Sequence, residues 1–223
     1  MADSPKIIIN FKTYSESSGE KAKQLAIHAE EVHDLSGVDI AIAPQAVDLK
    51  AIRDVVNIPI YAQHIDPISP GNSTGLYLPE ALMEAGINGT LINHSEKQLK
   101  LSTIDEIVQI TKKYDLTSIL CSNNIRTSAA CASLNPDFIA IEPPALIASG
   151  YAVSQCEPEI VSNTVAAVHE INDSIPVLCG AGITNGDDVK AALDLGAEGV
   201  LLASGVVKAE DSKAVLEDLV SKI

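Results

Sequence analysis

The segment Asp137-Phe138-Ile139-Ala140-Ile141-Glu142-Pro143-Pro144-Ala145-Leu146-Ile147-Ala148-Ser149-Gly150 joins an apolar run to a loop of small residues, with a carboxylate between them. The two prolines after Glu142 can continue neither a helix nor a central strand, so a buried strand is predicted to end at this carboxylate. The loop that follows lies between rigid prolines and a flexible glycine, which is typical of a segment that moves as a unit. Glu142 by itself could also simply cap or salt-bridge a strand end, and its role has to be judged from the rest of the chain.

Short apolar runs of this kind occur eight times in the 223 residues, each followed by a helical pattern. The predicted strands span 6–12, 38–43, 60–62, 89–92, 118–121, 138–141, 177–179 and 200–202. The predicted helices span 16–33, 46–56, a short segment from 79, 103–114, 124–133, 158–170, 185–193 and 204–220. Each pair takes about 28 residues, which suits a βα unit. The chain is therefore predicted to be an α/β protein, a (β/α)8 TIM barrel in which residues 1–223 form a single domain; an open doubly wound sheet with fewer strands is the alternative.

The composition narrows the possible partners and the compartment. A formal net charge of −15 leaves no basic patch for a nucleic acid, and no stretch is long and apolar enough for a membrane span. The four cysteines form no C-x-x-C pair and have no histidine at metal-ligand spacing, so they are interpreted as buried free thiols. Together with an N-terminus that has no signal-peptide pattern, this predicts a cytoplasmic protein without a metal or cofactor.

Polar or small residues end several of the predicted strands. In a barrel all strands end on one face, where the active sites of this fold lie. These ends contribute a cation, an imidazole, a carboxylate and a glycine-rich rim: Asn10, Lys12, His94, Glu142, Gly180–Gly182 and Ala203–Gly205. Taken singly, each has an ordinary interpretation as a solvated charge, a turn residue or a helix entry. Taken together they predict a site for a small phosphorylated substrate, because glycine-rich backbone after the last two strands lets N–H groups approach an anion.

The residue types also suggest a reaction. His94-Ser95-Glu96 resembles the start of a helix with Ser95 as a possible cap, and a helix N-terminus disfavours an imidazolium. A neutral His94 can donate an N–H to a carbonyl oxygen while Glu142 takes a proton from the adjacent carbon and Lys12 stabilises the developing negative charge. These roles describe an isomerisation through an enediolate. The other histidines, His64 beside Asp66 among them, are expected not to be metal ligands.

Five motifs, in this order, resemble the triosephosphate isomerase family in its short archaeal form: Asn10-Phe11-Lys12, Asn93-His94-Ser95-Glu96, Glu142-Pro143-Pro144, Cys179-Gly180-Ala181-Gly182 and Leu202-Ala203-Ser204-Gly205. The resemblance extends from the first predicted strand to the last helix. It implies an enzyme of glycolysis and gluconeogenesis that interconverts dihydroxyacetone phosphate and D-glyceraldehyde 3-phosphate without cofactor or metal.

The resemblance also implies individual roles. Glu142 would be the catalytic base, His94 the electrophile, Lys12 and Asn10 substrate-binding groups, and Glu96 a neighbour that orders the site. The implied phosphate contacts are backbone amides around Ile147, Gly182, Ala203 and Ser204, and Gly180 is a further implied substrate-binding residue. The loop Ala145–Gly150 would be a lid, although it reads Ala-Leu-Ile-Ala-Ser-Gly where archaeal members commonly have Glu-Leu-Ile-Gly-Thr-Gly.

The same resemblance implies self-association. The segment 64–78 is too long for a simple connection, and Thr74-Gly75 matches the loop tip that reaches a neighbouring subunit in this family. A homodimer at least is implied, and the short archaeal form suggests a homotetramer. Two alternatives to the isomerase remain at this level: a phosphate-binding barrel enzyme such as a Schiff-base aldolase, which would need a buried lysine where the sixth strand has Glu142, and a non-catalytic sugar-phosphate sensor.

Overall fold

Eight parallel strands form the centre of the protein in a computed structural model that describes residues 5–143 and 152–223. The strands are β1 Lys6–Asn10, β2 Asp39–Ala43, β3 Tyr61–Ala62, β4 Gly89–Ile92, β5 Thr117–Ser122, β6 Phe138–Ile141, β7 Val177–Cys179 and β8 Gly199–Leu202. Their order is β2-β1-β8-β7-β6-β5-β4-β3, and a parallel bridge between Ile42 and Ile60 brings the two edges together. This is the predicted (β/α)8 barrel, and the open doubly wound alternative is wrong.

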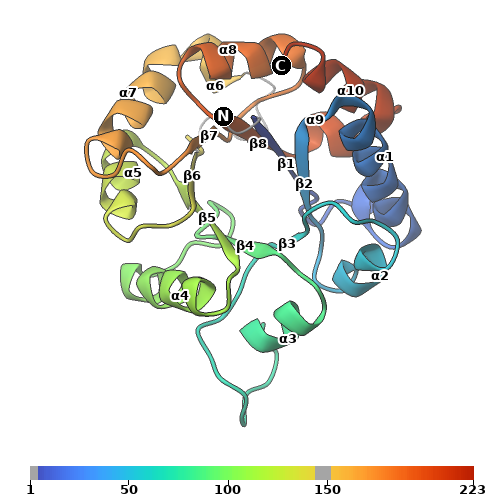
Figure 1. Cartoon of the computed structure of the whole chain (residues 1–223), viewed down its shortest axis with the longest axis vertical. Coiled ribbons are helices and arrows are strands. Elements are labelled where there is room, and N and C mark those ends of the chain that lie inside the picture. Colours follow the sequence, from blue (N-terminus) through green and yellow to red (C-terminus); the bar gives the residue numbers. More distant parts are fainter. Residues whose placement is uncertain (1–4, 144–151) are drawn as a thin grey trace.

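The helices form a ring around the barrel (Figure 1). They are α1 Glu20–Ser36, α2 Leu49–Arg53, α3 Pro79–Glu84, α4 Leu101–Lys113, α5 Ile125–Ala132, α6 Val153–Cys156, α7 Pro158–His169, α8 Gly186–Asp194, α9 Ser204–Val207 and α10 Ser212–Val220, with a 3-10 turn η1 Ser15–Ser17 before α1. Gly37 ends α1 in the left-handed conformation (φ 73°), donating its N–H to the carbonyl of His33. Pro79 opens α3 and Pro158 opens α7, positions where the missing N–H costs nothing.

Alternation along the strands divides the core into two layers. One cluster of buried side chains fills the barrel interior: Ile8, Ala41, Ala43, Tyr61, Leu91, Ile119, Cys121, Ala140, Leu178 and Leu201. Their neighbours in sequence, such as Ile7 and Ile9, belong to the larger cluster that packs against the helices. Because successive side chains of a strand point to opposite faces, residues two positions beyond an interior residue lie at the mouth of the barrel. This parity positions the candidate site.

Three local predictions differ from the structure. The predicted helix 204–220 is two helices, α9 and α10, separated at residues 208–211. Four residues before α7 form the short helix α6, which the sequence pattern did not indicate. His94-Ser95-Glu96 does not start a helix: it is a turn closed by a 2.7 Å hydrogen bond from the Lys97 N–H to the His94 carbonyl, and α4 begins at Leu101.

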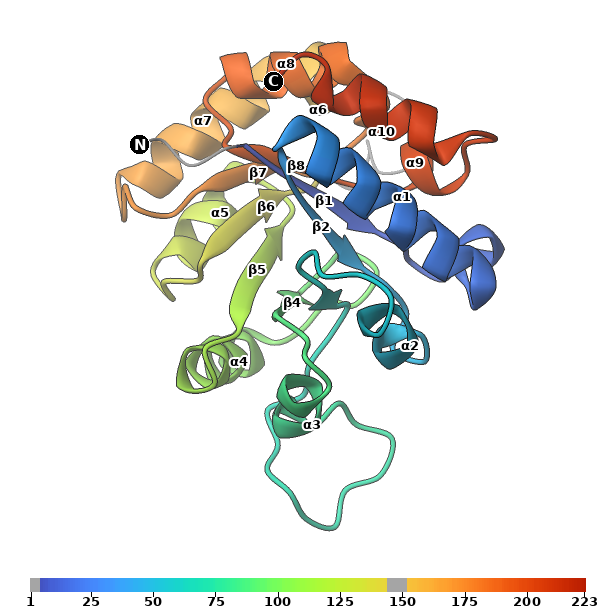
Figure 2. The same cartoon turned by 45° about the vertical axis from the view of Figure 1, so that its right-hand side comes forward.

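The long connection 64–78 runs out from the barrel between β3 and α3 (Figure 2). Its base is held together by Asp66 and Tyr77, whose backbones pair at 3.1 Å, while the Asp66 carboxylate accepts the Tyr77 N–H at 2.7 Å. His64 lies 3.1 Å from the same carboxylate. The loop is therefore anchored at its base and exposed at its tip.

Within the described ranges, none of the helices has the length and apolar character needed to cross a membrane.

Candidate active site

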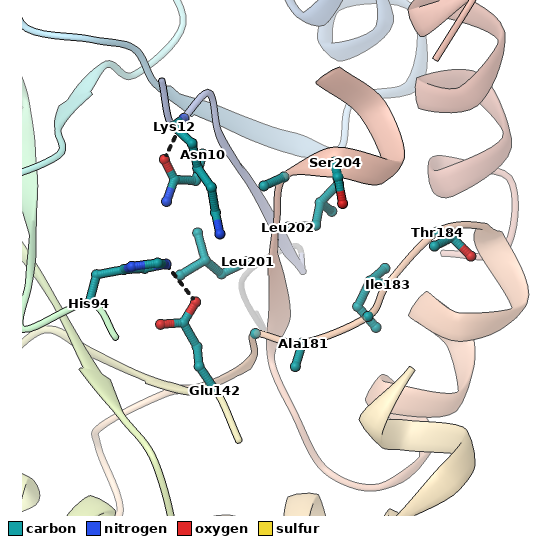
Figure 3. A pocket seen from close by; sticks show the side chains of 13 residues that line it. Asn10, Lys12, His94, Glu142, Ala181, Ile183, Thr184, Leu201, Leu202 and Ser204 are labelled. Atoms are coloured by element: carbon teal, nitrogen blue, oxygen red, sulfur yellow. Dashed lines mark hydrogen bonds and ion pairs between the residues drawn. The ribbon is translucent and has the colours of Figure 1, made fainter. Parts of the chain in front are cut away.

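The mouth of the barrel collects residues from strands that are far apart in sequence. Asn10, Glu142, Gly180 and Ala203 each lie two positions beyond an interior residue of their strand, so parity places all four at the mouth. A cavity at this end is lined by Asn10, Lys12, His94, Glu142, Gly180, Ala181, Gly182, Ile183, Thr184, Leu201, Leu202, Ala203 and Ser204. Figure 3 shows Lys12, His94 and Glu142 facing Ser204 and the segment Ala181–Thr184 across this cavity.

His94 and Glu142 form a buried pair. Nε2 of His94 lies 3.3 Å from Oε1 of Glu142, and their side chains are only 7% and 4% exposed. Nδ1 of His94 accepts the backbone N–H of Glu96 at 3.1 Å. Because an acceptor nitrogen carries no proton, this bond assigns the ring the neutral form with its proton on Nε2, pointing into the cavity. The backbone N–H of Glu96 in this turn thus keeps His94 neutral, a role that the sequence prediction assigned to the N-terminus of a helix.

Glu142 also retains an unused acceptor. In the described part of the chain its Oε2 atom is buried and has no hydrogen-bond partner. A buried polar atom without a partner is costly, and such atoms are frequent where a substrate supplies the missing contact. The pair therefore presents one N–H donor and one free carboxylate oxygen side by side.

Lys12 reaches the cavity from a strained backbone. It has φ 48°, a left-handed conformation that is uncommon for residues other than glycine, and its N–H donates to the Asn10 side chain at 3.0 Å. Its Nζ atom makes a 2.9 Å ion pair with Glu96, with the lysine side chain 10% exposed. Backbone strain of this kind persists only where surrounding contacts impose it, and it concentrates at functional sites.

Gln63 supplies part of that constraint. It follows β3 and donates to the carbonyls of Lys12 and Ala43, both at 3.0 Å, and lies 3.4 Å from the Asn10 side-chain oxygen. Sequence reasoning missed this residue. The available signal was its position, since it is a polar residue directly after a strand, as Lys12 is shortly after β1.

The opposite rim consists of backbone and small side chains. A β-carbon at Gly180 would lie 2.5 Å from Cγ of Glu142, so only glycine lets the carboxylate occupy its position. Gly182 has φ 75°, and Thr184 beyond it is tied to Asp188 by two 2.9 Å bonds. Ala203 precedes α9, whose first N–H groups have no partner within the helix. The rim can offer backbone donors to an anion.

The thiols around the site are not reactive groups. Burial, and after it the neighbouring Glu142 carboxylate, raises the pKa of Cys121 well above its ordinary value. Burial raises the pKa of Cys179, directly before Gly180, to about 12. Both side chains therefore stay protonated at neutral pH and serve as small apolar groups beneath the site. Among residues 5–143 and 152–223, no group of three or more His, Cys, Asp or Glu side chains is arranged to hold a metal ion.

The structure brings most of the predicted site residues together. Asn10, Lys12, His94, Glu142, Gly180, Gly182, Ala203 and Ser204 all line one cavity. Glu96 lies beside it, in contact with Lys12 and with the His94 ring. Ile147 and the predicted lid Ala145–Gly150 lie outside the described residues. His64 is hydrogen-bonded to Asp66 at the base of the long loop.

Comparisons with known proteins agree over nearly the whole chain. The family model described as "Triosephosphate isomerase" matches residues 5–222. The protein named triosephosphate isomerase from Methanobrevibacter smithii is 55% identical over 99% of this chain and 100% of its own length. Those of Methanothermus fervidus (53%; 99% and 100%) and Methanocaldococcus jannaschii (55%; 97% and 99%) are similarly related.

Proposed function

The chain belongs to the triosephosphate isomerase family, and from this premise we propose how its residues carry out the reaction. The chain is an aldose–ketose isomerase that interconverts dihydroxyacetone phosphate and D-glyceraldehyde 3-phosphate. The reaction moves one proton between two adjacent carbons and one proton between the oxygens that they carry. It requires a base beside the carbons, a neutral acid beside the oxygens and a cation for the negative charge of the enediolate.

We assign these roles to Glu142, His94 and Lys12. Glu142 takes the proton from the carbon next to the carbonyl and returns it to the neighbouring carbon. His94 donates its Nε2 proton to the carbonyl oxygen and then takes the proton of the neighbouring hydroxyl, which restores the ring, while Lys12 together with Asn10 stabilises the charge on the oxygens. The observation that carries the proposal is the position of the His94 donor, 3.3 Å from Glu142 Oε1, with Nδ1 occupied by the Glu96 N–H. Acid and base are thus close enough to act on adjacent atoms of one substrate.

Glu96 has a positioning role in this proposal. It holds Nζ of Lys12 at 2.9 Å and supplies the N–H that selects the tautomer of His94. For the phosphate we propose the backbone amides of Gly182, Ala203 and Ser204, with Ile147 as a further contact; Gly180 lines the same cavity, but its N–H already donates to the Ile141 carbonyl at 2.9 Å. The small side chains of this rim and the free N–H groups at the start of α9 support that assignment.

A coupled assay tests the reaction directly. Purified protein given D-glyceraldehyde 3-phosphate should form dihydroxyacetone phosphate, detected by reduction with an NADH-dependent dehydrogenase. The assay should work in the presence of a chelator and without added cofactor. No product formation would overturn the proposal, and binding of phosphate without turnover would favour the sensor.

We also propose that the chain forms a homo-oligomer, at least a dimer and, as in the short archaeal form it resembles, a tetramer. Residues 71–77 of the long loop are exposed, Leu76 to 49% and Tyr77 to 37%. A hollow of about 410 Å³ beside the site is lined by residues that include Lys12, His64 and Glu96. We propose that the loop tip at Thr74 and Gly75 of one copy enters this hollow of another, burying apolar surface on both.

Light scattering on a sizing column tests the assembly, since the mass should be two or four times 23.4 kDa. Thr74→Arg, which places a bulky charge at the tip, should shift the mass toward the monomer, and a wild-type monomer would overturn the proposal.

We further propose that the protein is cytoplasmic and forms a single domain. All four cysteines are free, which supports a reducing compartment such as the cytoplasm, but Cys156 is exposed at the end of α6, so the prediction that all four are buried is wrong for this residue. The eight strands belong to one sheet, which supports a single domain over residues 1–223.

A further inference from the structure

Asn93 occupies the position where β4 stops. The pairing of β4 with β5 ends at Ile92 opposite Leu120, so Asn93 would face Cys121 in the next position. The backbone of Asn93 turns out of the sheet instead, with φ 59°. Asparagine tolerates this left-handed conformation better than most residues, and the turn directs the next residue, His94, into the cavity.

The side chain of Asn93 replaces the lost backbone contact. Its Nδ2 donates to the carbonyl of Cys121 on β5 at 3.0 Å, which adds one more link between β4 and β5 after the backbone has left the sheet. Its Oδ1 accepts the N–H of Leu99 at 2.9 Å, six residues further on. One carboxamide thus closes the loop that carries His94 and Glu96 and joins that loop to β5.

Glu142 is hydrogen-bonded to Ser122, the residue that follows Cys121 on β5. Its backbone N–H donates to the carbonyl of Ser122 at 2.8 Å. The end of β5 therefore holds both members of the buried pair, His94 through Asn93 and Cys121, and Glu142 through Ser122. Strands β4, β5 and β6 lie side by side in this order, so both connections span a single strand spacing (Figure 1).

We infer that Asn93 is a positioning residue for the isomerisation: its carboxamide links the His94 loop to Cys121 on β5 and so sets the distance between the His94 donor and the Glu142 base. The inference rests on the proposed function, in which those two groups act on adjacent atoms. The contribution of Asn93 is to the geometry of proton transfer, because its side chain bonds to Cys121 and Leu99, while the described part of the phosphate rim lies on β7 and β8.

Two substitutions of Asn93 test its hydrogen bonds to Cys121 and Leu99 separately. Asn93→Gly keeps the left-handed backbone and removes both hydrogen bonds. Asn93→Asp keeps the acceptor for Leu99 but places a carboxylate oxygen against the Cys121 carbonyl. Both should lower kcat, Asn93→Gly by about 10- to 100-fold, the order expected for a displacement of about 1 Å. KM and inhibition by inorganic phosphate should remain near the wild-type values, and inhibition by a phosphorylated hydroxamate that mimics the planar enediolate should weaken with kcat.

Asn135 provides the matched control. It is also an asparagine with φ 58°, it ends the turn after α5, and its carboxamide accepts from Asn172 on the surface. Asn135→Gly removes one exposed hydrogen bond where Asn93→Gly removes two part-buried ones, so it should lower the melting temperature less and leave kcat unchanged. An equal loss of kcat in both asparagine variants would overturn the positioning role, as would a parallel weakening of phosphate and hydroxamate inhibition in Asn93→Gly.

Glu142→Ala, measured in parallel, distinguishes a failure of the proposed catalytic roles from a failure of the positioning role of Asn93. Full turnover in Glu142→Ala would overturn the catalytic assignment on which the inference rests. Loss of turnover in Glu142→Ala together with wild-type kcat in both Asn93 variants would overturn the positioning role of Asn93 alone. Loss of kcat in Glu142→Ala and in both Asn93 variants, with Asn135→Gly unaffected, is the result expected.

Discussion

The two sides of the barrel mouth hold their functional groups in different ways. On the side of β1, β4 and β6, three titratable side chains project into the cavity, each buried and held by hydrogen bonds or ion pairs: Lys12, His94 and Glu142. On the side of β7 and β8, the described part of the cavity wall has no ionisable side chain: it is made of glycine, alanine, serine and the aliphatic residues Ile183, Leu201 and Leu202, and the side chain of Thr184 turns to Asp188. Figure 3 shows the two sides facing each other.

The difference follows from what each side has to bind. Proton transfer needs atoms with defined protonation at fixed distances, which only ionisable side chains supply. An anion can be bound by backbone N–H groups, which requires that side chains be absent or small. Variants on the side of β1, β4 and β6 should therefore lower kcat, and variants on the side of β7 and β8 should raise KM. A variant where the two sides touch should lower kcat although the substituted residue belongs to the phosphate rim.

Glu142→Ala should give the largest effect on the side chain half. Removing a positioned base should lower kcat by about 10²- to 10⁴-fold, while inhibition by inorganic phosphate should be retained because the rim is intact. Steady-state kinetics in the coupled assay measure this. Glu198→Gln is the control, since Glu198 lies half-exposed at the start of β8 and away from the mouth. Near-wild-type kcat in Glu142→Ala would remove Glu142 from the role of base.

Gly180→Ala should break the contact between the two sides. The new β-carbon would lie 2.5 Å from Cγ of Glu142 and 3.0 Å from the Ile141 carbonyl, so the carboxylate has to move. A displacement of this size should cost about 10²-fold in kcat, although the substitution adds only a methyl group to the rim. If kcat stays at the wild-type value, Glu142 tolerates displacement and its distance from His94 is less important than proposed.

The sequence predicts the side chain half of the site well, because each group is a polar residue at the end of an apolar run. Eight such runs were sufficient to place Asn10, Lys12, His94 and Glu142 on one face. The β7 and β8 rim was predicted from small residues together with the barrel fold. Strand parity then explains why residues so distant in sequence meet.

Two features could not be derived in this way. Ser95 was predicted to cap a helix because Ser followed by Glu fits a cap, but helical periodicity begins only at Leu101, and a tight turn occupies the space between. The sequence did not identify Gln63, because one neutral polar residue after a two-residue strand is a weak signal by itself. Its importance lies in three contacts with residues on β1 and β2 or just beyond them, and tertiary contacts of this kind leave no local pattern.

Ser204→Glu should give the opposite kinetic result from Glu142→Ala. A carboxylate at the start of α9 would repel the phosphate of the substrate, so KM should rise by at least about tenfold while kcat changes less. Ser204→Ala at the same position is the control: if the backbone N–H, and not the hydroxyl, contacts the phosphate, its KM should remain close to wild type. A large rise of KM in Ser204→Ala would assign the contact to the hydroxyl instead.

The smallest effect concerns the thiols beneath the two sides, and it appears only in alkaline solution. Burial raises the pKa of Cys179, below the rim, from 9.0 to about 12, and that of Cys131, on the buried face of α5, to about 11. A raised pKa means that the folded state retains a proton that the unfolded state releases. The contribution of each thiol to the free energy of unfolding is therefore constant well below pH 9 and falls between pH 9 and the folded pKa by at most about 1.4 kcal/mol per pH unit.

Cys179→Ala tests this dependence without touching the catalytic side. The variant should be less stable at neutral pH because a buried side chain is truncated, but between pH 9 and pH 10 it should lose about 1 kcal/mol less than the wild type, since one proton release is missing. Urea unfolding at several pH values measures both slopes. The comparison depends on the slopes and not on the absolute stabilities, so the cavity left by the truncation does not affect it. Equal slopes in the two proteins would show that Cys179 titrates at the same pH in the folded and unfolded chains, and that its burial beneath the rim does not keep it protonated.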